Sequence, residues 1–285
     1  MTRSETAKIQ LTSRIEQLSA QLPSFVEYPQ VPGPQGRELY GWIDFEGLPN
    51  TRDLGGLIGA DGRRIKPGLL LRSGALGGFG FAADLERLRD EYRLRLIVDL
   101  RDDAELAERP DPMDAFPQVT YLHASIITEE TIGITQEKDA AAAARARLKA
   151  QGGDARDLMA SLYPNLLLAR PGVEGYRALL RAILNCDDGA ALWHCSVGRD
   201  RCGMASVLIE SALGVSWEDI ENDYLATNVF APVEFTADGM ASLRSLNAAR
   251  GAVEAKYGSF LGYISSCLGF SPKDIDVLRS RYLES

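Results

Sequence analysis

Short apolar runs that resemble strands alternate with longer runs of helical spacing from about Tyr40 onward, and this alternation limits the fold more than any other feature. The predicted strands are 69–73, 95–101, 120–125 and 191–194, and the predicted helices among them are 83–93, 173–186 and 201–213. Ser-x-x-acid patterns at 216–219 and 271–274 predict further helix starts. We therefore expect an α/β fold, with a mainly parallel central sheet flanked by helices and a helical C-terminal third.

The N-terminal part of the chain precedes this alternation. Leu18 and Leu22 share helical spacing with Ile15, which predicts a short amphipathic helix that packs on the body of the protein. A Pro/Gly-rich stretch follows and predicts an extended arm. We therefore expect residues 1–36 to form a helix and arm, and residues 37–285 to form a single domain.

An alanine-rich run at 138–157 interrupts the alternation inside that predicted domain. Alanine is the strongest helix former, and Gly152 and Gly153 break the run. The sequence therefore predicts a helical insertion between a strand and the next core helix.

Composition excludes several classes of protein. The net charge of −9 argues against nucleic-acid binding, which requires a basic face. No segment is apolar enough to cross a membrane, and the start lacks the apolar core of a signal peptide. We expect a cytoplasmic protein without stable membrane insertion, with non-classical secretion left open. The four cysteines are too few for a disulfide scaffold, and no pair has zinc-ligand spacing, so we expect reduced thiols, no metal and no cofactor.

The stretch WHCSVGRDRCGMAS (193–206) joins a predicted strand to a predicted helix. The unpaired N–H groups and the dipole of a helix start favour a bound anion. Cys195 is expected to end the strand and Arg201 to begin the helix, so that the field of the helix stabilises a thiolate beside a guanidinium that can hold two phosphate oxygens. Gly198 lies where the loop needs a positive φ or a close backbone approach. The Cys-x5-Arg spacing thus predicts a nucleophile and an oxyanion site in one turn.

The alternative is that Cys195 is a small buried cysteine at the end of a core strand. The spacing alone does not decide, because Cys-x5-Arg also arises by chance. His194 before the thiol, Gly198 in the loop and Gly203 after Arg201 all agree with a phosphate-binding loop. We therefore favour catalysis over packing.

This loop resembles the signature of the cysteine-based tyrosine phosphatases. It is most similar to the branch whose loop reads His-Cys-x-x-Gly-Lys-Asp-Arg, which includes the mycobacterial secreted tyrosine phosphatase B and atypical lipid phosphatases. Further motifs of that branch occur in order: GLPNTRDLGG (47–56), LLRSGAL (70–76), VDLRDDAELAERPD (98–111), DYLATN (223–228) and YGSFLGYI (257–264). The resemblance extends from about Phe45 to Tyr282. It implies a phosphatase fold in which a mobile helical lid, at about 138–165, covers the active site.

The resemblance also implies roles for individual residues. Cys195 would attack phosphorus and carry a phosphocysteine intermediate, while Arg201 would bind phosphate and stabilise the transition state. Asp200 would be the general acid. Asp99 is the competing acid or its partner, and an ion pair with a loop arginine is an equally open role for it. The phosphate would be bound by the loop as a whole, which comprises Ser196, Val197, Gly198, Arg199, Asp200 and Arg201.

Two loop positions depart from the branch. Arg199 replaces its usual lysine, which keeps the charge but adds a planar fork and leaves substrate preference open. Cys202 replaces a serine or threonine whose hydroxyl bonds the nucleophilic sulfur. Because a thiol is a weaker donor, we expect slower breakdown of the intermediate and a thiol able to form a disulfide with Cys195. Packing at the helix start is the alternative role of Cys202.

Other residues are expected to support the site without reacting. His194 is expected to hold Cys195 through a ring hydrogen bond, and His123 to be a satisfied core histidine. The run 44–53 is expected to be largely solvated. Within it, we expect a turn that braces the site and contains Asn50, Arg52 and Asp53.

The leading hypothesis is a cysteine-dependent phosphomonoester hydrolase, acting as a tyrosine or dual-specificity protein phosphatase or as a phosphoinositide phosphatase. A small-metabolite phosphatase with the same loop is an alternative, because specificity would lie in the variable lid. A rhodanese-type sulfurtransferase also uses a cysteine loop at a helix start, but His194 and Arg201 argue against it. A phosphate-binding module without catalysis is disfavoured by the intact Cys195 and Arg201. The expected partner is a phosphorylated protein, a phosphoinositide or a small phosphomonoester.

Overall fold

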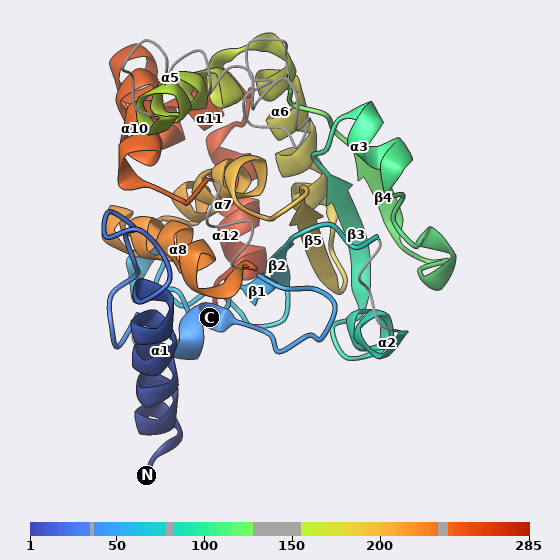
Figure 1. The fold of residues 1–285 in the computed structure, drawn as a ribbon. Coiled ribbons are helices and arrows are strands. Elements are labelled where there is room, and N and C mark those ends of the chain that lie inside the picture. Colours follow the sequence, from blue (N-terminus) through green and yellow to red (C-terminus); the bar gives the residue numbers. More distant parts are fainter. Residues whose placement is uncertain (35–36, 78–81, 128–154, 233–238) are drawn as a thin grey trace.

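The computed structural model describes residues 1–34, 37–77, 82–127, 155–232 and 239–285. These residues form an α/β fold around a five-stranded sheet with the order β1-β2-β5-β3-β4 (Figure 1). The strands are β1 (Arg52–Asp53), β2 (Leu70–Ser73), β3 (Leu94–Asp99), β4 (Thr120–His123) and β5 (Ala190–His194). β1 is antiparallel to β2, and all other neighbours are parallel, so the predicted mainly parallel sheet is confirmed.

Helices account for most of the remaining described residues. In chain order they are α1 (Arg3–Ser19), α2 (Ala82–Asp90), α3 (Asp103–Glu108), α5 (Ala155–Leu168), α6 (Arg170–Asn185), α7 (Asp200–Leu213), α8 (Trp217–Phe230), α10 (Leu243–Tyr257), α11 (Phe260–Ser266) and α12 (Pro272–Tyr282). Of the helices that the structure describes, none is both long and apolar enough to span a bilayer. The predicted caps are confirmed, because Ser216 and Ser271 accept hydrogen bonds from the third backbone N–H of α8 and α12.

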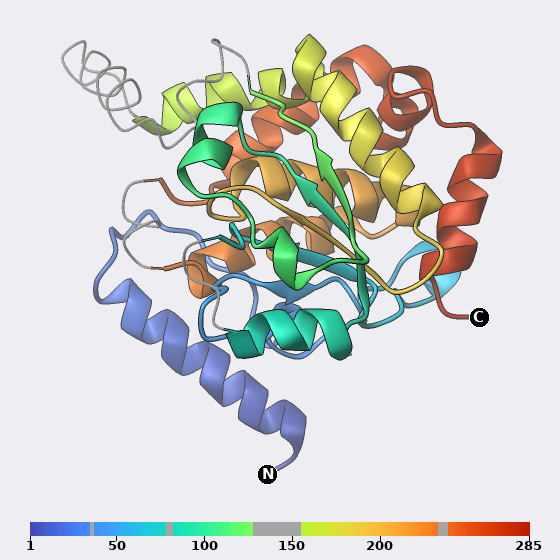
Figure 2. The same ribbon diagram turned by 90° about the vertical axis from the view of Figure 1, so that its right-hand side faces the viewer.

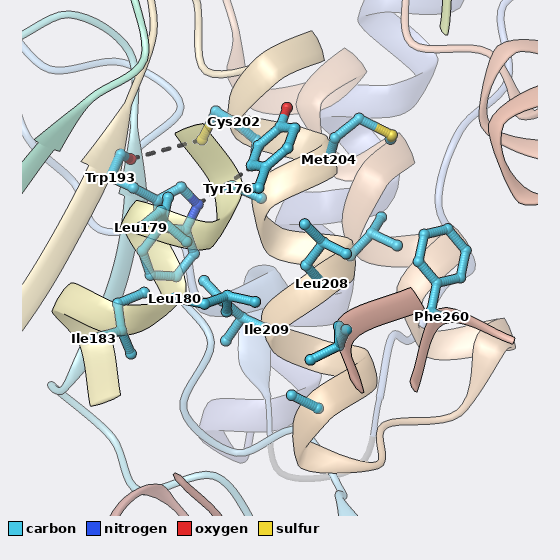
Figure 3. Close-up of a cluster of buried hydrophobic side chains, with 14 of the residues drawn as sticks. Tyr176, Leu179, Leu180, Ile183, Trp193, Cys202, Met204, Leu208, Ile209 and Phe260 are labelled. Atoms are coloured by element: carbon cyan, nitrogen blue, oxygen red, sulfur yellow. Dashed lines mark hydrogen bonds between the residues drawn. The ribbon is translucent and has the colours of Figure 1, made fainter. Parts of the chain in front are cut away.

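The strands bury both faces of the sheet, because successive side chains of a strand point in opposite directions. On β3, Leu96 and Val98 face the larger apolar cluster, whereas Ile97 faces a smaller one that includes Leu88 of α2. Helices α6 and α7 supply much of the larger cluster, in which Trp193 of β5 packs (Figure 3). This packing places the carboxyl end of β5 at the start of α7, in the middle of the sheet.

The N-terminal helix packs on the body as predicted. In both ribbon views α1 lies along the lower edge of the molecule (Figure 1, Figure 2). Its residues Leu11 and Leu18 are buried in an apolar cluster that includes Val229 and Phe230 of α8. The guanidinium of Arg14 lies 5.7 Å from the centre of the Phe230 ring and donates a 2.7 Å hydrogen bond to the Val229 carbonyl. This helix therefore covers apolar surface of α8 that would otherwise face water.

The predicted insertion at 138–165 lies mostly outside the described residues. Its final part, from Ala155, belongs to α5, which packs against α10. An ion pair between Asp157 and Arg244 joins these two helices. The described residues therefore fix where the segment re-enters the fold.

The expectation that Arg52 and Asp53 form a turn is wrong. They form β1, because their backbone pairs with Arg72 and Leu71 of β2. The prediction of a largely solvated run at 44–53 is also wrong, because only Asp44, Glu46 and Pro49 of this run are exposed. Asn50, whose φ is +63°, and Arg52 are fully buried, because their polar groups find partners inside the protein.

We predict that replacing Leu11 of α1 with alanine lowers the free energy of unfolding by about 2–5 kcal/mol, because the change leaves a cavity against α8. Ile9 lies on the same helix but is 55% exposed, so Ile9→Ala should change stability by no more than about 0.5 kcal/mol. Urea denaturation of both variants tests this. If Leu11→Ala lowers the free energy of unfolding no more than Ile9→Ala does, α1 does not unfold together with the sheet.

Candidate active site

The loop Cys195–Arg201 connects β5 to α7 at the carboxyl edge of the sheet. The strand ends at His194, which is the last residue of the predicted range 191–194, so Cys195 follows the strand. The helix begins at Asp200, one residue earlier than the sequence predicts. Cys195 and Arg201 are 3% and 2% exposed, whereas Val197 and Arg199 are half-buried. Ligands of parallel α/β sheets bind at this edge, so the fold places the predicted loop where a binding site is expected.

Gly198 has the conformation predicted for it. Its φ is +75°, and a Cβ atom there would lie 2.7 Å from the carbonyl oxygen of Ser73. Any larger residue would therefore strain the backbone and clash with β2. Close contact between the loop and the end of β2 depends on this glycine.

The loop carbonyls are held from beneath by side chains of other elements. Asn50 donates hydrogen bonds to the carbonyls of Val197 (3.0 Å) and Gly198 (3.2 Å), and Arg72 donates to the Gly198 carbonyl at 2.9 Å. Asn50 thus braces the site as predicted, although it does so next to a strand. Arg72, in the LLRSGAL motif, was not predicted to do so.

Asp223 of α8 is the centre of a buried ionic cluster below the loop. It forms ion pairs with Arg37, Arg52 and Arg72, and all four side chains are at most 1% exposed. Burial alone would raise the pKa of Asp223, but the three arginines outweigh it and hold that pKa well below its usual range. The DYLATN motif therefore supplies, through Asp223, the negative charge that fixes Arg72 under the loop.

Glu105 of α3 orients the loop arginine. Its carboxylate forms a paired contact with Arg201, in which Nη2 donates to Oε1 at 2.9 Å and Nη1 donates to Oε2. It also accepts a hydrogen bond from Ser196. Burial opposes its charge, but Arg201 and Ser196 lower the pKa of Glu105 to about 2. The sequence analysis missed this residue, although the capping pattern of Asp102 and Glu105 could have revealed the start of α3.

Asp200 lies in the first turn of α7 and is 6% exposed. The Nε of Arg199 lies 3.2 Å from both of its carboxylate oxygens. One of these oxygens also accepts a hydrogen bond from the hydroxyl of Tyr163 in α5. The predicted acid is thus within the loop, beside the predicted cationic residue.

Asp99 lies at the end of β3 in a separate charged group. Arg101 binds both of its oxygens and also lies 3.0 Å from Asp111. Tyr121 donates a further hydrogen bond of 2.9 Å to Asp99. Burial opposes the charge of Asp99, but His194 and Arg101 hold its pKa well below the usual range. The arginine paired with Asp99 is therefore Arg101, outside the Cys195–Arg201 loop.

His194 connects that charged group to Cys195. Its Nε2 lies 3.0 Å from Asp111, and its Nδ1 lies 3.2 Å from the carbonyl oxygen of Cys195. Burial would lower the pKa of His194, but Asp99 and Asp111 outweigh it and raise it. The protonated form of the ring carries a hydrogen on both nitrogens, so that form can donate to the Cys195 carbonyl while facing Asp111. This contact agrees with the predicted supporting role.

Asp99, Asp111 and His194 also bring three possible metal ligands within 4.8 Å of one another. Arg101 already bridges the two carboxylates, with Nη2 at 2.7 Å from Asp99 and 3.0 Å from Asp111. The positive charge that these carboxylates require is therefore supplied by the protein. The donor set does not fit a metal ion without displacement of Arg101.

Cys202 is fully buried in the first turn of α7. Its Sγ donates to the carbonyl of Trp193 at 3.6 Å (Figure 3). Burial, opposed in part by Arg72, raises the pKa of Cys202 to about 12, so the group is a neutral thiol at physiological pH. The contact with Trp193 favours the packing role. The expected effects on the intermediate and on oxidation stay predictions.

His123 lies apart from the loop, at the end of β4. Its Nε2 lies 2.8 Å from the carbonyl oxygen of Arg101, so its ring has a polar partner as predicted. It is half-buried and not part of the core.

Gly203 permits close packing in α7, since a Cβ there would lie 3.1 Å from the ring of Tyr224.

Comparison with known proteins places this geometry in context. Residues 43–284 of the chain match the Tyrosine phosphatase family. This range includes the whole loop as well as Glu105 and Asp223. A provisionally named tyrosine-protein phosphatase of Cupriavidus necator is 30% identical over 275 residues, which is 90% of this chain and 93% of that protein.

We predict that Glu105→Gln lowers the free energy of unfolding by about 3–5 kcal/mol at pH 7, because it leaves Arg201 buried without its counter-charge. Glu108→Gln is the matched control, since Glu108 ends the same helix but is exposed. Urea denaturation at pH 7 should show a large loss for the first variant and almost none for the second.

The same pair predicts a pH dependence. The pKa of Glu105 is about 2 in the folded protein against 4.5 for a free glutamate, so its contribution is complete above pH 4.5 and is lost as the pH falls towards 2. Stability should therefore fall less steeply with acid in Glu105→Gln than in the wild type. Parallel curves would contradict the ion pair.

Proposed function

This chain belongs to the tyrosine phosphatase family and is a phosphoric monoester hydrolase, and from this we propose that it acts through a phosphocysteine intermediate on Cys195. One observation carries the proposal. Cys195 and Arg201 lie in one buried loop at the start of α7, where Glu105 fixes the guanidinium and Asn50 fixes the loop backbone. A nucleophile and an oxyanion site are thus preorganised together.

In the proposed first step, the thiolate of Cys195 forms a bond to phosphorus, and the bond from phosphorus to the leaving oxygen breaks. Asp200 gives its proton to that oxygen, so the product leaves as a phenol or an alcohol. In the second step, water bonds to phosphorus and passes a proton to Asp200, and the sulfur–phosphorus bond breaks. This releases inorganic phosphate and restores both Cys195 and the acid.

Arg201 and the start of α7 would stabilise the charge on the transferred phosphoryl group. A planar guanidinium binds two oxygens at once, and a helix N-terminus adds N–H donors and a favourable dipole. Glu105 supports this role, because it holds both terminal nitrogens of Arg201 on the side of Ser196 and α3. The orientation therefore exists before substrate binds.

We propose Asp200 as the general acid and give Asp99 a supporting role. Asp200 belongs to the loop itself, whereas Asp99 is fully buried and already bound by Arg101 and Tyr121. Transfer of a proton from Asp99 would require those contacts to open.

We propose that this chain is a member of the His-Cys-x-x-Gly-Lys-Asp-Arg branch. We also propose that its substrates are phosphotyrosine and other phosphorylated protein side chains, or phosphoinositides. The half-buried Arg199 supports this proposal, because it adds a guanidinium to the rim of the loop. A panel of phosphopeptides, phosphoinositides, and sugar and nucleotide phosphates separates these classes from a small-metabolite phosphatase. Thiosulfate tests the sulfurtransferase alternative.

We predict that Cys195→Ser abolishes hydrolysis of p-nitrophenyl phosphate while vanadate still binds, because the variant keeps the anion site but loses the nucleophile. Wild-type activity should be unchanged in EDTA. Steady-state kinetics and vanadate titration measure both effects. Full activity of the serine variant, or inactivation by EDTA, would refute the cysteine mechanism.

A second prediction concerns the acid. Proton donation contributes about a hundredfold to ten-thousandfold to the rate, and poor leaving groups need it most. Asp200→Asn should therefore slow alkyl phosphates far more than p-nitrophenyl phosphate, whereas Asp99→Asn should slow both alike. If only Asp99→Asn discriminates between leaving groups, the two roles are exchanged.

A further inference from the structure

Two tyrosines from outside the loop form a chain that ends on Asp200. Tyr163 of α5 and Tyr224 of α8 are each 1% exposed. The Tyr163 hydroxyl contacts Oδ1 of Asp200 and lies 2.5 Å from the Tyr224 hydroxyl. Their rings pack edge to face with centres 6.3 Å apart. The two hydroxyl groups and the carboxylate, which come from three different helices, thus form one buried chain of hydrogen bonds that ends at the predicted acid.

The direction of each hydrogen bond follows from the number of hydrogens. An ionised carboxylate only accepts, so Tyr163 must give its single hydrogen to Asp200. The oxygen of Tyr163 is then left as the acceptor for the hydroxyl of Tyr224. Burial and the charge of Asp200 raise the pKa of Tyr163 well above its usual value, which favours the protonated hydroxyl.

We propose that Tyr163 is a positioning residue that determines which oxygen of Asp200 carries the catalytic proton. A protonated carboxyl group has one donor oxygen and one acceptor oxygen. While Tyr163 donates to Oδ1, that oxygen stays an acceptor and the proton lies on Oδ2, because the Nε of Arg199 is 3.2 Å from both oxygens and does not distinguish between them. Tyr224 acts through Tyr163 by fixing the direction of its hydrogen. This inference rests on the proposed role of Asp200 as the general acid.

The surrounding packing holds the chain of hydroxyls in place. Gly203 leaves room for the Tyr224 ring against α7, since a Cβ there would lie 3.1 Å from it. One turn beyond Tyr163 on α5, the hydroxyl of Tyr263 donates to the carbonyl of Leu167. The Tyr163 hydroxyl therefore depends on the position of α5, and the Tyr224 ring depends on its packing against α7.

Tyr163→Phe tests the proposal, because it keeps the ring and removes only the hydroxyl. We expect kcat to fall by about tenfold or more for alkyl phosphates and by less than about threefold for p-nitrophenyl phosphate, since only poor leaving groups need a correctly placed proton. KM and the affinity for vanadate should not change. Tyr224→Phe should give the same pattern with a smaller effect, because Tyr163 can still donate to Asp200.

Tyr263→Phe is the matched control. It also removes a buried tyrosine hydroxyl bound to α5, but one that has no contact with Asp200. Tyr263→Phe should lower the melting temperature as Tyr163→Phe does. It should not slow alkyl phosphates more than p-nitrophenyl phosphate. The proposal is overturned if Tyr163→Phe slows both substrates equally or behaves like Tyr263→Phe. If Tyr163→Phe does not fold, Tyr224→Phe decides by the same criterion.

Failure of the proposed function has a different outcome. A wild-type protein without phosphomonoesterase activity, or an active Cys195→Ser variant, would remove the mechanism itself. An Asp200→Asn variant without leaving-group discrimination would remove the acid. A discriminating Asp200→Asn together with a non-discriminating Tyr163→Phe would reject the positioning role alone.

Discussion

The ion pairs of Asp223 with three buried arginines are the interaction on which the site depends. A buried guanidinium is costly unless its charge is compensated, so Arg72 can lie beneath the loop only because Asp223 lies there too. Arg72 and Asn50 then bind the carbonyls of Val197 and Gly198. Since the C=O and N–H of a trans peptide point in opposite directions, these contacts turn the N–H groups of Gly198 and Arg199 away from Asn50 and Arg72, as the proposed anion site requires.

The same design recurs around the loop. Two basic side chains near Cys195 each have a carboxylate behind them: Glu105 behind Arg201, and Asp111 behind His194. These carboxylates fix the direction of the cation and do not themselves occupy the loop. A carboxylate beneath a cation reduces its charge but also removes its freedom to rotate, and a fixed donor loses less entropy when substrate binds. Paired in this way, buried arginines can surround the loop of a protein whose net charge is −9.

The sequence alone predicts the parts of the site that are local in the chain. Cys195, Gly198 and Arg201 lie within seven residues, so spacing and loop chemistry are enough to identify them. Glu105, Asp223 and Tyr163 were not predicted in their observed roles, because each reaches the loop from another helix. The alternating periods likewise reveal the central strands and helices. They do not reveal β1, since two residues carry no period and their burial depends on side-chain partners from β2 and α8.

The proposed sites of phosphate binding and proton donation rest on different parts of this fold. Cys195 and Arg201 are held by β5 and α7, which contribute to the apolar core, and by Glu105 of α3. The proposed acid Asp200 also contacts α5, which contains the last residues of the alanine-rich run. A change in the packing of α5 would therefore alter the surroundings of Asp200 while the contacts of Arg201 with Glu105 stayed intact. The fold thus separates the contacts of Asp200 with α5 from those that hold Arg201, so the proposed acid and the proposed anion site depend on different helices.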